Sequence, residues 1–366
     1  MAVLTVNAGS GSLHLAYVDH DAAGARLDLS QPPGSAQAAR AVADLVAANP
    51  KPEAVGHRLV HGGDLVRRPM LLDDRLRARL DEVTCLAPLH LPPALALIDR
   101  LRERLPEVPH VVCPDTAFHA DLPAVAATYP LPAEWRSRWG LRRYGFHGLS
   151  YAYALRRAEQ LLRRPAAELH LVITHLGGGC SVCAVRNGRS VDTSMGFTPL
   201  EGVAMSTRSG SIDPGLLLWL LEDERLSRED LSDGLSRRSG LLGLSDGRSQ
   251  DTRVLVDAAP RDRAAALALD VFVHRVRREI AAEVTSLGRL DALVFTGEIG
   301  WDQPEVREGV CAGLAPLGVR LPVMGNRTDD GPVSDPDAPV PVLVVEPREE
   351  LAIAAETRAA LSGAGR

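Results

Sequence analysis

A strand, a glycine-rich turn and a second strand occur twice in this chain, near the start of each half. Residues 3–18 read VLTVNAGSGSLHLAYV, and residues 171–185 read LVITHLGGGCSVCAV. Such a turn can bring backbone N–H groups close to an anion, because glycine accepts unusual dihedral angles and no side chain protrudes. One such hairpin is common as a plain turn. Two of them predict a duplicated domain that holds nucleotide phosphates between its copies.

A third element, residues 290–300 (LDALVFTGEIG), again runs from an apolar strand into a glycine turn. This pattern favours a nucleotide-dependent phosphotransferase. A strand at 169–174 opens the second half, and the apolar spacing predicts helices over 37–49, 91–105, 149–162, 261–287, 305–314 and 349–361. Strands that alternate with helices indicate α/β layers. The polar stretch 326–339 is the segment expected to be most flexible.

The composition is that of an ordinary protein with cores large enough for two domains. The chain has 366 residues, of which 45% are hydrophobic and 24% are charged. Its net charge of −6 gives no electrostatic reason to expect nucleic acid or an anionic membrane as a partner. No apolar run reaches transmembrane length, and the N-terminus lacks the pattern of a signal peptide. We therefore expect a cytoplasmic protein.

The cysteines and the single lysine limit the chemistry that the chain can use. Five scattered cysteines do not form a disulfide framework. Cys180 and Cys183 have the spacing of half a zinc site, but no second Cys or His pair accompanies them, and buried small residues are the preferred interpretation. Because Lys51 is the only lysine, an anion must be held by Arg, His or backbone N–H groups.

Arginine and histidine stand beside glycine in three separate segments. Residues 56–63 read GHRLVHGG, residues 144–148 read YGFHG, and residues 207–210 read TRSG. A lone arginine is most often a surface charge or a structural donor, and a lone histidine in an apolar setting is more often a satisfied core residue. Their density beside glycine favours phosphoryl transfer.

These segments belong to a longer series of motifs that resembles the acetate kinase family. In chain order the motifs are NAGSGS (7–12), GHRLVHGG (56–63), APLHLPP (87–93), DTAFH (115–119), RRYGFHG (142–148), THLGGGCSV (174–182), DTSMGFTPLEG (192–202), TRSGSIDPG (207–215), SGLLGLS (239–245) and EELAIA (349–354). The resemblance implies duplicated actin-like (ribonuclease H-like) α/β domains with an active-site cleft between them. Residues 1–118 plus 351–366 are expected to form the N-terminal domain, and residues 119–350 the C-terminal domain with most nucleotide-binding loops.

The resemblance implies an ATP- and Mg²⁺-dependent carboxylate kinase that phosphorylates acetate or a similar short acid by reversible in-line transfer. The carboxylate is already a nucleophile, so the protein must align the reactants and neutralise charge. Arg58 and Arg208 match the family's two arginines, and their planar donor forks suit a carboxylate and a phosphoryl group. His147 and His175 match its histidines near the transferred group, and Asp115 matches an acid that orients the arginines or the substrate.

The remaining site residues follow from the same resemblance. Asn7 and Glu349 match the Mg²⁺ (or Mn²⁺) site, where oxygen ligands suit the ion. A small apolar pocket for the methyl group of the acid is implied for Val60, Leu89, Phe146 and Pro199. Contacts with ATP or ADP are implied for Ser10, Ser12, His14, Gly177, Gly178, Gly179, Asp251, Arg253, Gly297, Glu298, Ile299 and Gly300. The family is typically homodimeric, so a homodimer is the expected assembly.

Four departures from the family pattern keep other functions open. His14 replaces the family's lysine, and residues 297–302 read GEIGWD in place of GGIGEN. The stretch before Arg58 is shorter than usual. Smaller changes place Gly178, Tyr151 and Ser211 where the family has Asn, His and Asp. The alternatives are a kinase of a different small carboxylate in a specialised pathway, and a non-catalytic relative that binds nucleotide or acyl phosphate.

Overall fold

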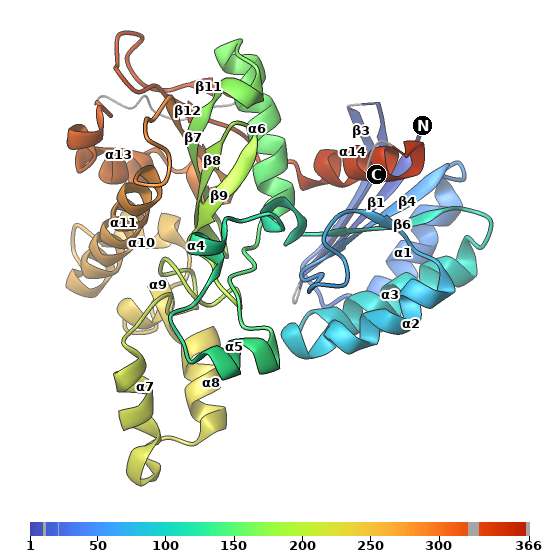
Figure 1. The fold of residues 1–366 in the computed structure, drawn as a ribbon, viewed down its shortest axis with the longest axis horizontal. Helices are drawn as coiled ribbons and strands as arrows, with labels where there is room; N and C mark the ends of the chain where they lie inside the picture. The colour runs from blue at the N-terminus through green and yellow to red at the C-terminus, as the bar shows by residue number, and fades with distance from the viewer. Residues whose placement is uncertain (10–11, 21, 321–328, 364–366) are drawn as a thin grey trace. The chain divides into compact units, whose positions relative to one another are not determined.

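The computed structural model describes residues 1–9, 12–20, 22–320 and 329–363 (Figure 1). The chain divides into two compact units. The first unit contains residues 1–120, 146–153 and 348–366, and the second contains residues 121–145 and 154–347. Each unit contains one mixed sheet whose first two strands form a hairpin, as the repeated sequence pattern predicts.

The sheet of the first unit has six strands in the order β3-β2-β1-β4-β6-β5. Its strands are β1 (Val3–Ala8), β2 (Leu13–Asp19), β3 (Ala22–Leu29), β4 (Ala54–Leu59), β5 (Met70–Leu71) and β6 (His110–Pro114). The β1–β2 hairpin and β3 are antiparallel, whereas β1, β4 and β6 are parallel neighbours. The short β5 closes the sheet antiparallel to β6.

The sheet of the second unit repeats this topology strand by strand. Its order is β11-β12-β10-β7-β8-β9. Its strands are β7 (His170–Leu176), β8 (Cys180–Arg186), β9 (Arg189–Thr193), β10 (Ala292–Thr296), β11 (Gly331–Pro332) and β12 (Val342–Val344). Antiparallel β7, β8 and β9 correspond to β1, β2 and β3, while parallel β10 and β12 correspond to β4 and β6. The expected duplicated α/β fold is confirmed.

Helices connect and cover the strands, and the six helices predicted from the sequence are among them. In the first unit they are α1 (Ala36–Ala48), α2 (Asp74–Leu80), α3 (Leu91–Arg104) and α14 (Glu349–Ser362). The second unit contains α4 (Ala124–Ala127), α5 (Ala133–Trp139), α7 (Pro214–Leu221), α8 (Arg228–Arg237), α9 (Gly240–Leu244), α10 (Thr252–Ala258), α11 (Arg263–Val284), α12 (Gly297–Asp302) and α13 (Pro304–Ala312). Helix α6 (Gly148–Leu162) begins in the first unit and continues in the second.

Local sequence explains where several of these helices begin and turn. The Ser35 hydroxyl accepts the N–H of Ala38 at the start of α1, and the Asp262 carboxylate accepts two N–H groups at the start of α11. After β10 the chain turns at Gly297, where φ is +79°, and α12 follows immediately. The stretch expected to be flexible, 326–339, contains β11 and lies partly outside the described residues.

The sheet of the first unit buries both of its faces. Leu4, Val6 and Leu15 pack with residues of α1 and α3, whereas Val3 and Val18 pack with Ala354 of α14. This alternation is expected of a strand whose successive side chains point to opposite faces. Among the described residues no helix has both the length and the apolar character to cross a membrane.

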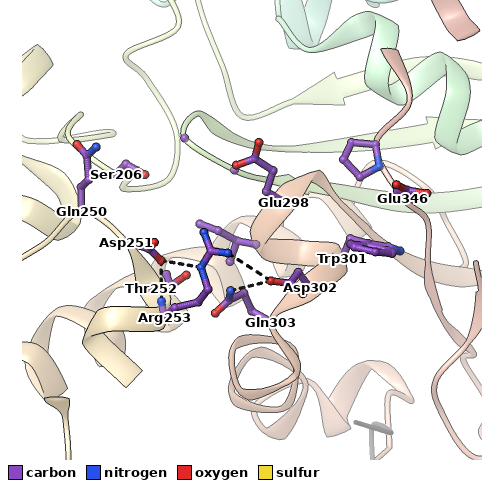
Figure 2. A pocket seen from close by; sticks show the side chains of 14 residues that line it. Ser206, Gln250, Asp251, Thr252, Arg253, Glu298, Trp301, Asp302, Gln303 and Glu346 are labelled. Carbon is purple, nitrogen blue, oxygen red and sulfur yellow. Dashed lines mark hydrogen bonds and ion pairs between the residues drawn. The ribbon is translucent and has the colours of Figure 1, made fainter. Parts of the chain in front are cut away.

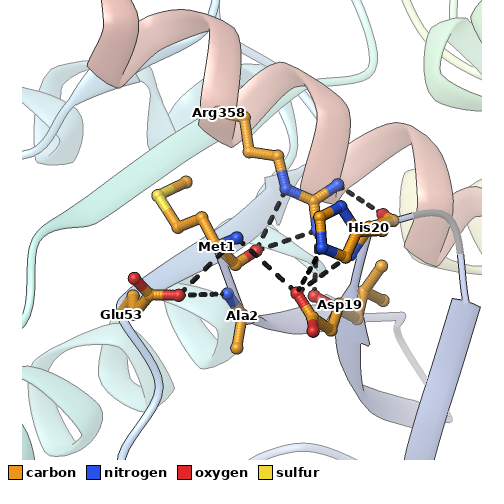
Figure 3. A network of polar contacts seen from close by, with 7 residues as sticks. Met1, Ala2, Asp19, His20, Glu53 and Arg358 are labelled. Carbon is orange, nitrogen blue, oxygen red and sulfur yellow. Dashed lines mark hydrogen bonds and ion pairs between the residues drawn. The ribbon is translucent and has the colours of Figure 1, made fainter.

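Arg358 anchors the C-terminal helix α14 to the sheet of the first unit (Figure 3). Its guanidinium donates hydrogen bonds to the carbonyl oxygens of Met1, Val18 and His20 at 2.7–3.2 Å. Because an arginine presents five N–H donors in a planar fork, one side chain can satisfy several carbonyl groups at a sheet edge. This contact ties the C-terminal half of α14 to the start of the chain and to the end of β2.

Candidate active site

In the first unit, three candidate residues lie at the carboxyl ends of adjacent parallel strands. Asn7 is on β1, Arg58 is on β4, and Asp115 directly follows β6. The Arg58 Nε and Nη2 atoms donate to Asp115 Oδ2 at 3.0 and 2.5 Å, and Nη1 donates to Asn7 Oδ1 at 3.3 Å. The carboxyl edge of parallel strands is the usual ligand-binding edge of α/β sheets. The structure therefore brings these residues together at the place where a ligand is expected.

The positive charge of Arg58 is paired with the negative charge of Asp115. The Asp115 side chain is fully buried, and the Arg58 side chain is 12% exposed. Burial by itself lowers the pKa of Arg58, but the charges of Asp115 and Glu349 and the hydrogen bond to Asp115 outweigh it and raise the pKa. Arg58 is therefore a permanent cation whose Nε and Nη2 edge is fixed by Asp115.

Asn7 and Glu349 have the oxygen chemistry that a magnesium ion requires. The Asn7 Nδ2 atom donates to Glu349 Oε2 at 2.7 Å, so the amide and the carboxylate are already adjacent. Magnesium in proteins is commonly held by one or two such side chains together with water and substrate phosphates. Among the described residues no group of three or more His, Cys, Asp or Glu side chains forms a metal cage. The pair fits an ion that keeps several waters.

Residues 146–148, the part of the YGFHG motif that belongs to the first unit, fold against Asp115. Gly148 donates its N–H to the Asp115 carbonyl at 3.0 Å, and a Cβ at Gly148 would lie 2.1 Å from that oxygen. His147 has a φ of +58°, which is uncommon for a residue other than glycine. Such a backbone persists only where the surroundings determine it. The histidine of the motif, which follows Phe146, is half-buried.

The apolar pocket residues of the first unit differ in their surroundings. Val60 and Phe146 are buried, and the ring of His61 meets the ring of Phe146 edge-on at 5.4 Å between centroids. Leu89 is 56% exposed. Pro199 belongs to the second unit. Val60 and Phe146 therefore contribute a preformed apolar surface, whereas Leu89 does not pack into the core of its unit.

The first glycine turn joins β1 to β2. Gly9 donates its N–H to the carbonyl of Ser12 at 2.8 Å, which closes the turn. Ser10, a predicted nucleotide contact, lies outside the described residues. His14 is on β2, where its Nδ1 atom lies 2.7 Å from Asp28 Oδ1 across the neighbouring strand β3. The residue that replaces the family's lysine is thus paired with a carboxylate of its own sheet.

The second glycine turn, between β7 and β8, lies beside His175 and the start of α12. Gly177 donates its N–H to the Gly179 carbonyl at 3.0 Å. A Cβ at Gly177 would be 3.6 Å from His175 Nε2 and 3.8 Å from the backbone nitrogen of Glu298. Cys180 donates to the Gly177 carbonyl, and burial raises the pKa of this thiol to about 12. Cys180 is therefore a buried neutral thiol.

Arg208 is held by the loop that follows β9. Its Nη1 atom donates to the carbonyl oxygen of Pro199 at 2.7 Å. Arg208 also acts electrostatically on Cys180, whose pKa it lowers slightly against the larger effect of burial. Arg208 therefore lies near the second glycine turn, within the same unit as His175 and Pro199.

A pocket of about 660 Å³ opens beside the second glycine turn (Figure 2). Among its lining residues are predicted nucleotide contacts, namely Gly177, Gly178, Asp251, Arg253, Glu298 and Ile299. Arg253 lies on α10, donates to Asp251 Oδ1 at 3.2 Å, and is 3.8 Å from Asp302 Oδ2. Trp301, which the sequence shows as added bulk, also lines the pocket. The volume is suited to a ligand of the size of a nucleotide.

The sequence gives little sign of the arginine that supports α12. Arg307 on α13 is fully buried, and its Nη1 atom donates to the carbonyl oxygens of Gly300 and Trp301 at 3.0 and 2.6 Å. These carbonyls lie at the end of α12, where intrahelical partners are missing. A single arginine in an amphipathic helix would ordinarily be taken for a surface residue. Its burial is visible only in the structure.

The repeated sheet and its two glycine turns define a duplicated α/β fold of the actin-like type. The sequence model of the Acetokinase family matches residues 36–355, and the chain belongs to that family. By this membership it is a phosphotransferase with a carboxyl group as acceptor. The family that the motifs resemble is confirmed.

Individual relatives agree with this assignment. The acetate kinase of a Synechococcus species is 48% identical over 312 residues, which is 84% of this chain and 77% of that protein. The acetate kinase of Thermotoga maritima is 42% identical over 319 residues, 86% of this chain and 79% of that protein. A solved propionate kinase from Francisella tularensis superposes with a TM-score of 0.88 at 32% identity, covering 98% of this chain and 99% of that one. The solved acetate kinase of Porphyromonas gingivalis gives a TM-score of 0.87 at 31% identity with the same coverage.

Proposed function

We propose that this chain transfers the γ-phosphoryl group of ATP to acetate or a similar short carboxylate, reversibly, giving an acyl phosphate and ADP. The observation that carries the proposal is the cluster at the carboxyl edge of the first sheet, where Arg58 is fixed by the buried Asp115 beside Asn7. A fixed planar cation at a strand end is what a carboxylate or phosphoryl group needs for bidentate binding.

The chemistry needs alignment and charge neutralisation rather than a strong base. A carboxylate oxygen forms a bond to the γ-phosphorus while the bond from that phosphorus to the bridging oxygen breaks, and no proton is transferred. Arg58 and Arg208 neutralise charge on the carboxylate and the phosphoryl group, and His147 and His175 donate hydrogen bonds to its equatorial oxygens. Val60 and Phe146, both buried in the first unit, provide the apolar surface for the alkyl group, together with Leu89 and Pro199.

Asn7 and Glu349 are proposed to hold Mg²⁺ or Mn²⁺. The ion supplies positive charge to the phosphate oxygens of the nucleotide when it is bound. Nucleotide contacts are proposed for the glycine turns and the pocket, through Ser10, Ser12, His14, Gly177, Gly178, Gly179, Asp251, Arg253, Gly297, Glu298, Ile299 and Gly300. Arg253 is the one basic side chain among the residues that line the described pocket.

We also propose that the protein is a cytoplasmic homodimer. Helix α7 supports the assembly, because four large apolar side chains of its sequence PGLLLWLL are more than 40% exposed: Leu216, Leu218, Trp219 and Leu221. A helix that exposes this many large apolar side chains usually marks a protein interface. Leu218→Arg should convert the dimer to a monomer, as measured by light scattering after size-exclusion chromatography. An unchanged mass would place the interface elsewhere.

Two other functions remain to be tested against this one. A kinase of a different small carboxylate is favoured by the pocket residues Glu298 and Trp301, which depart from the family pattern. Each methylene in an apolar pocket changes binding by only about 1–3 kcal/mol, so the residues do not separate acetate from propionate. A non-catalytic relative that binds nucleotide or acyl phosphate is the third function, and any turnover eliminates it.

An acyl-hydroxamate assay with ATP, Mg²⁺ and a panel of acids led by acetate and propionate tests the proposal. We expect turnover on short aliphatic acids and a loss of about a thousandfold in kcat for Arg208→Ala, because a cation at the transferring group is removed. Turnover confined to a larger or polar acid would favour the specialised kinase. Unchanged acyl phosphate formation by Arg208→Ala would refute the mechanism.

A further inference from the structure

Three side chains from separate segments of the second unit hold the loop that contains Pro199. Tyr129 lies between α4 and α5, Arg143 lies between α5 and α6, and Glu201 is in the loop itself. The Tyr129 hydroxyl donates to Glu201 Oε2 at 2.5 Å and accepts the backbone N–H of Phe197 at 2.8 Å. Arg143 Nη2 donates to Glu201 Oε1 at 2.8 Å. We call Tyr129, Arg143 and Glu201 the loop clamp.

The segment around Arg143 adds backbone contacts to the same loop. Arg143 Nη1 donates to the Ser194 carbonyl at 3.1 Å, and the N–H groups of Tyr144 and Gly145 donate to the Gly196 carbonyl at 3.1 and 3.3 Å. A Cβ at Gly196 would lie 2.0 Å from the Tyr129 hydroxyl, so only glycine leaves room for the clamp. The loop is therefore held at several points along its length.

The clamp keeps its hydrogen-bonding state at physiological pH. Burial raises the pKa of Tyr129, and the hydrogen bond and negative charge of Glu201 raise it further, so the phenol remains a donor. Burial by itself lowers the pKa of Arg143, but the charge of Glu201, the Tyr129 hydroxyl, the hydrogen bond to Glu201 and the charge of Asp192 together outweigh it, and the pKa is raised. The Arg143 guanidinium also lies over the Tyr129 ring, 5.5 Å from its centroid. The three groups form one neutralised network.

The clamped loop leads directly to Arg208. The Pro199 carbonyl accepts Arg208 Nη1 at 2.7 Å, and Pro199 is two residues before Glu201. We propose that Tyr129, Arg143 and Glu201 are positioning residues, which hold Arg208 for phosphoryl transfer through the Pro199 carbonyl. The proposal rests on the proposed carboxylate kinase function. The hydrogen bond from Arg208 Nη1 to the Pro199 carbonyl ties the position of the guanidinium to that of the loop.

A loosened clamp should impair the chemical step more than nucleotide binding. Displacement of a catalytic group by about 1 Å can cost about a hundredfold in rate. We expect Tyr129→Phe, which removes the bonds to Phe197 and Glu201 without changing the ring, to lower kcat about tenfold to a hundredfold. The KM for ATP should change little, because the pocket near α10 and α12 is not altered. Glu201→Gln should act in the same direction and serves as a second variant.

The matched control is Tyr17→Phe in the first unit. The Tyr17 hydroxyl is buried and has no hydrogen-bond partner within the described part of the chain, so its removal breaks no bond. We expect wild-type kinetics for this variant. A general effect of losing a buried hydroxyl would appear in both variants and would contradict the positioning role.

A double-mutant cycle with Arg208→Ala separates positioning from simple stabilisation. If the clamp acts through Arg208, Tyr129→Phe should cause no further loss of kcat in the Arg208→Ala background. Hydrogen exchange supplies a readout that is independent of turnover, because the Phe197 amide should exchange faster in Tyr129→Phe. Additive losses in kcat, or unchanged Phe197 exchange, would overturn the positioning role while wild-type turnover still supports the kinase. A wild-type protein inactive on every acid would overturn both proposals.

Discussion

The two units share one sheet topology but stabilise their charged groups in opposite ways. In the first unit Arg58, a proposed reaction residue, pairs with a fully buried carboxylate, whereas in the second unit Arg208 donates to a backbone carbonyl. The first unit buries His119 as a neutral imidazole, and the second buries the carboxyl group of Glu283. A shared fold therefore does not impose a shared electrostatic design. The two units should respond differently to the same perturbation.

The largest difference is expected when each arginine is removed. Arg58→Ala breaks the buried ion pair with Asp115, and breaking such a pair costs about 3–5 kcal/mol of unfolding free energy. Arg208→Ala removes a hydrogen bond to a carbonyl, a loss of about 1–2 kcal/mol. Both variants should lose activity, and only Arg58→Ala should be strongly destabilised. Urea unfolding followed by circular dichroism measures the difference.

Arg58→Ala paired with Asp115→Ala provides the control for this comparison. Removing both charged groups should recover part of the lost stability, because no unpaired charge remains in the core. Equal destabilisation by Arg58→Ala and Arg208→Ala would mean that the ion pair does not distinguish the units.

The next effect concerns acid, which should destabilise the first unit through His119. Burial lowers the pKa of His119 to about 4, from an ordinary value of 6.5. Between these values the unfolded chain binds more protons than the folded chain, so the histidine favours unfolding as the pH falls from 6.5 to 4. Above pH 6.5 this cost is absent. At pH 4 and below it approaches about 3 kcal/mol.

Thermal unfolding of His119→Gln between pH 4 and 7 tests this expectation. The variant should lose less stability than the wild type as the pH falls, because glutamine does not gain a proton. His20→Gln is the matched control, since the His20 side chain is 88% exposed. Parallel pH profiles for wild type and His119→Gln would refute the assignment.

The sequence predicted the first unit's cluster better than the loops of the second unit. The family resemblance identified Asn7, Arg58 and Asp115 and gave them roles. The structure then shows that they lie at or directly after the ends of β1, β4 and β6. Tyr129 and Glu201 are 72 residues apart and lie in irregular segments, where no period links them. Their contact depends on how the chain folds, which a single sequence does not encode in any local pattern.

Substitutions in the pocket show the same limit at shorter range. The sequence shows that Glu298 and Trp301 depart from the family loop, but it does not show on which side of α12 each lies. The structure places both at the pocket, and it shows that Arg307 holds the end of α12. A helix of six residues makes fewer than two turns, so its sequence shows no repeating pattern that would tell which side chains face the pocket.

An effect of opposite sign to that of His119 is expected for Glu283 in the second unit. Burial raises the pKa of Glu283 well above 4.5, and the nearby Asp192 and Glu279 charges raise it further. Its contribution to stability is therefore complete below pH 4.5 and is lost as the pH rises through the raised pKa. The N–H of Ala184 donates to the carboxyl group at 3.1 Å and partly offsets the shift. Glu283→Gln should be more stable than wild type at neutral pH, as measured by hydrogen exchange in β8.

The opposite trends of the two units can be compared in one experiment. Hydrogen exchange, corrected for its intrinsic pH dependence, should report β6 and the segment after it becoming less protected in acid before β8 does. Glu229→Gln on α8 is the control, because that side chain also belongs to the second unit but is 79% exposed. Loss of protection in both units at the same pH would show that they unfold as one.

The smallest expected effect concerns the carboxylates that line the pocket of the second unit, which we call its acidic wall. The test asks whether their negative charge weakens the binding of ATP. Glu298 stands in the first turn of α12, and Asp251, Asp302 and Glu346 add three more carboxylates against one arginine, Arg253. A like charge about 4 Å from a phosphate oxygen costs about 1 kcal/mol in water, and less at greater distance. Glu298→Gln should therefore lower the KM for ATP about twofold to fivefold, with kcat nearly unchanged.

Glu305→Gln makes the same charge change on α13, outside the pocket-lining residues, and should leave the KM for ATP unchanged. The effect of Glu298→Gln should also shrink in 0.5 M salt, because exposed charges are screened within a few ångströms there. Equal changes in both variants would indicate the net charge of the protein rather than a local repulsion. A rise in KM would mean that Glu298 accepts hydrogen bonds from the nucleotide, so that its carboxylate recognises the ligand. Only a fall in the KM for ATP that is confined to Glu298→Gln would show that the acidic wall weakens nucleotide binding in the second unit.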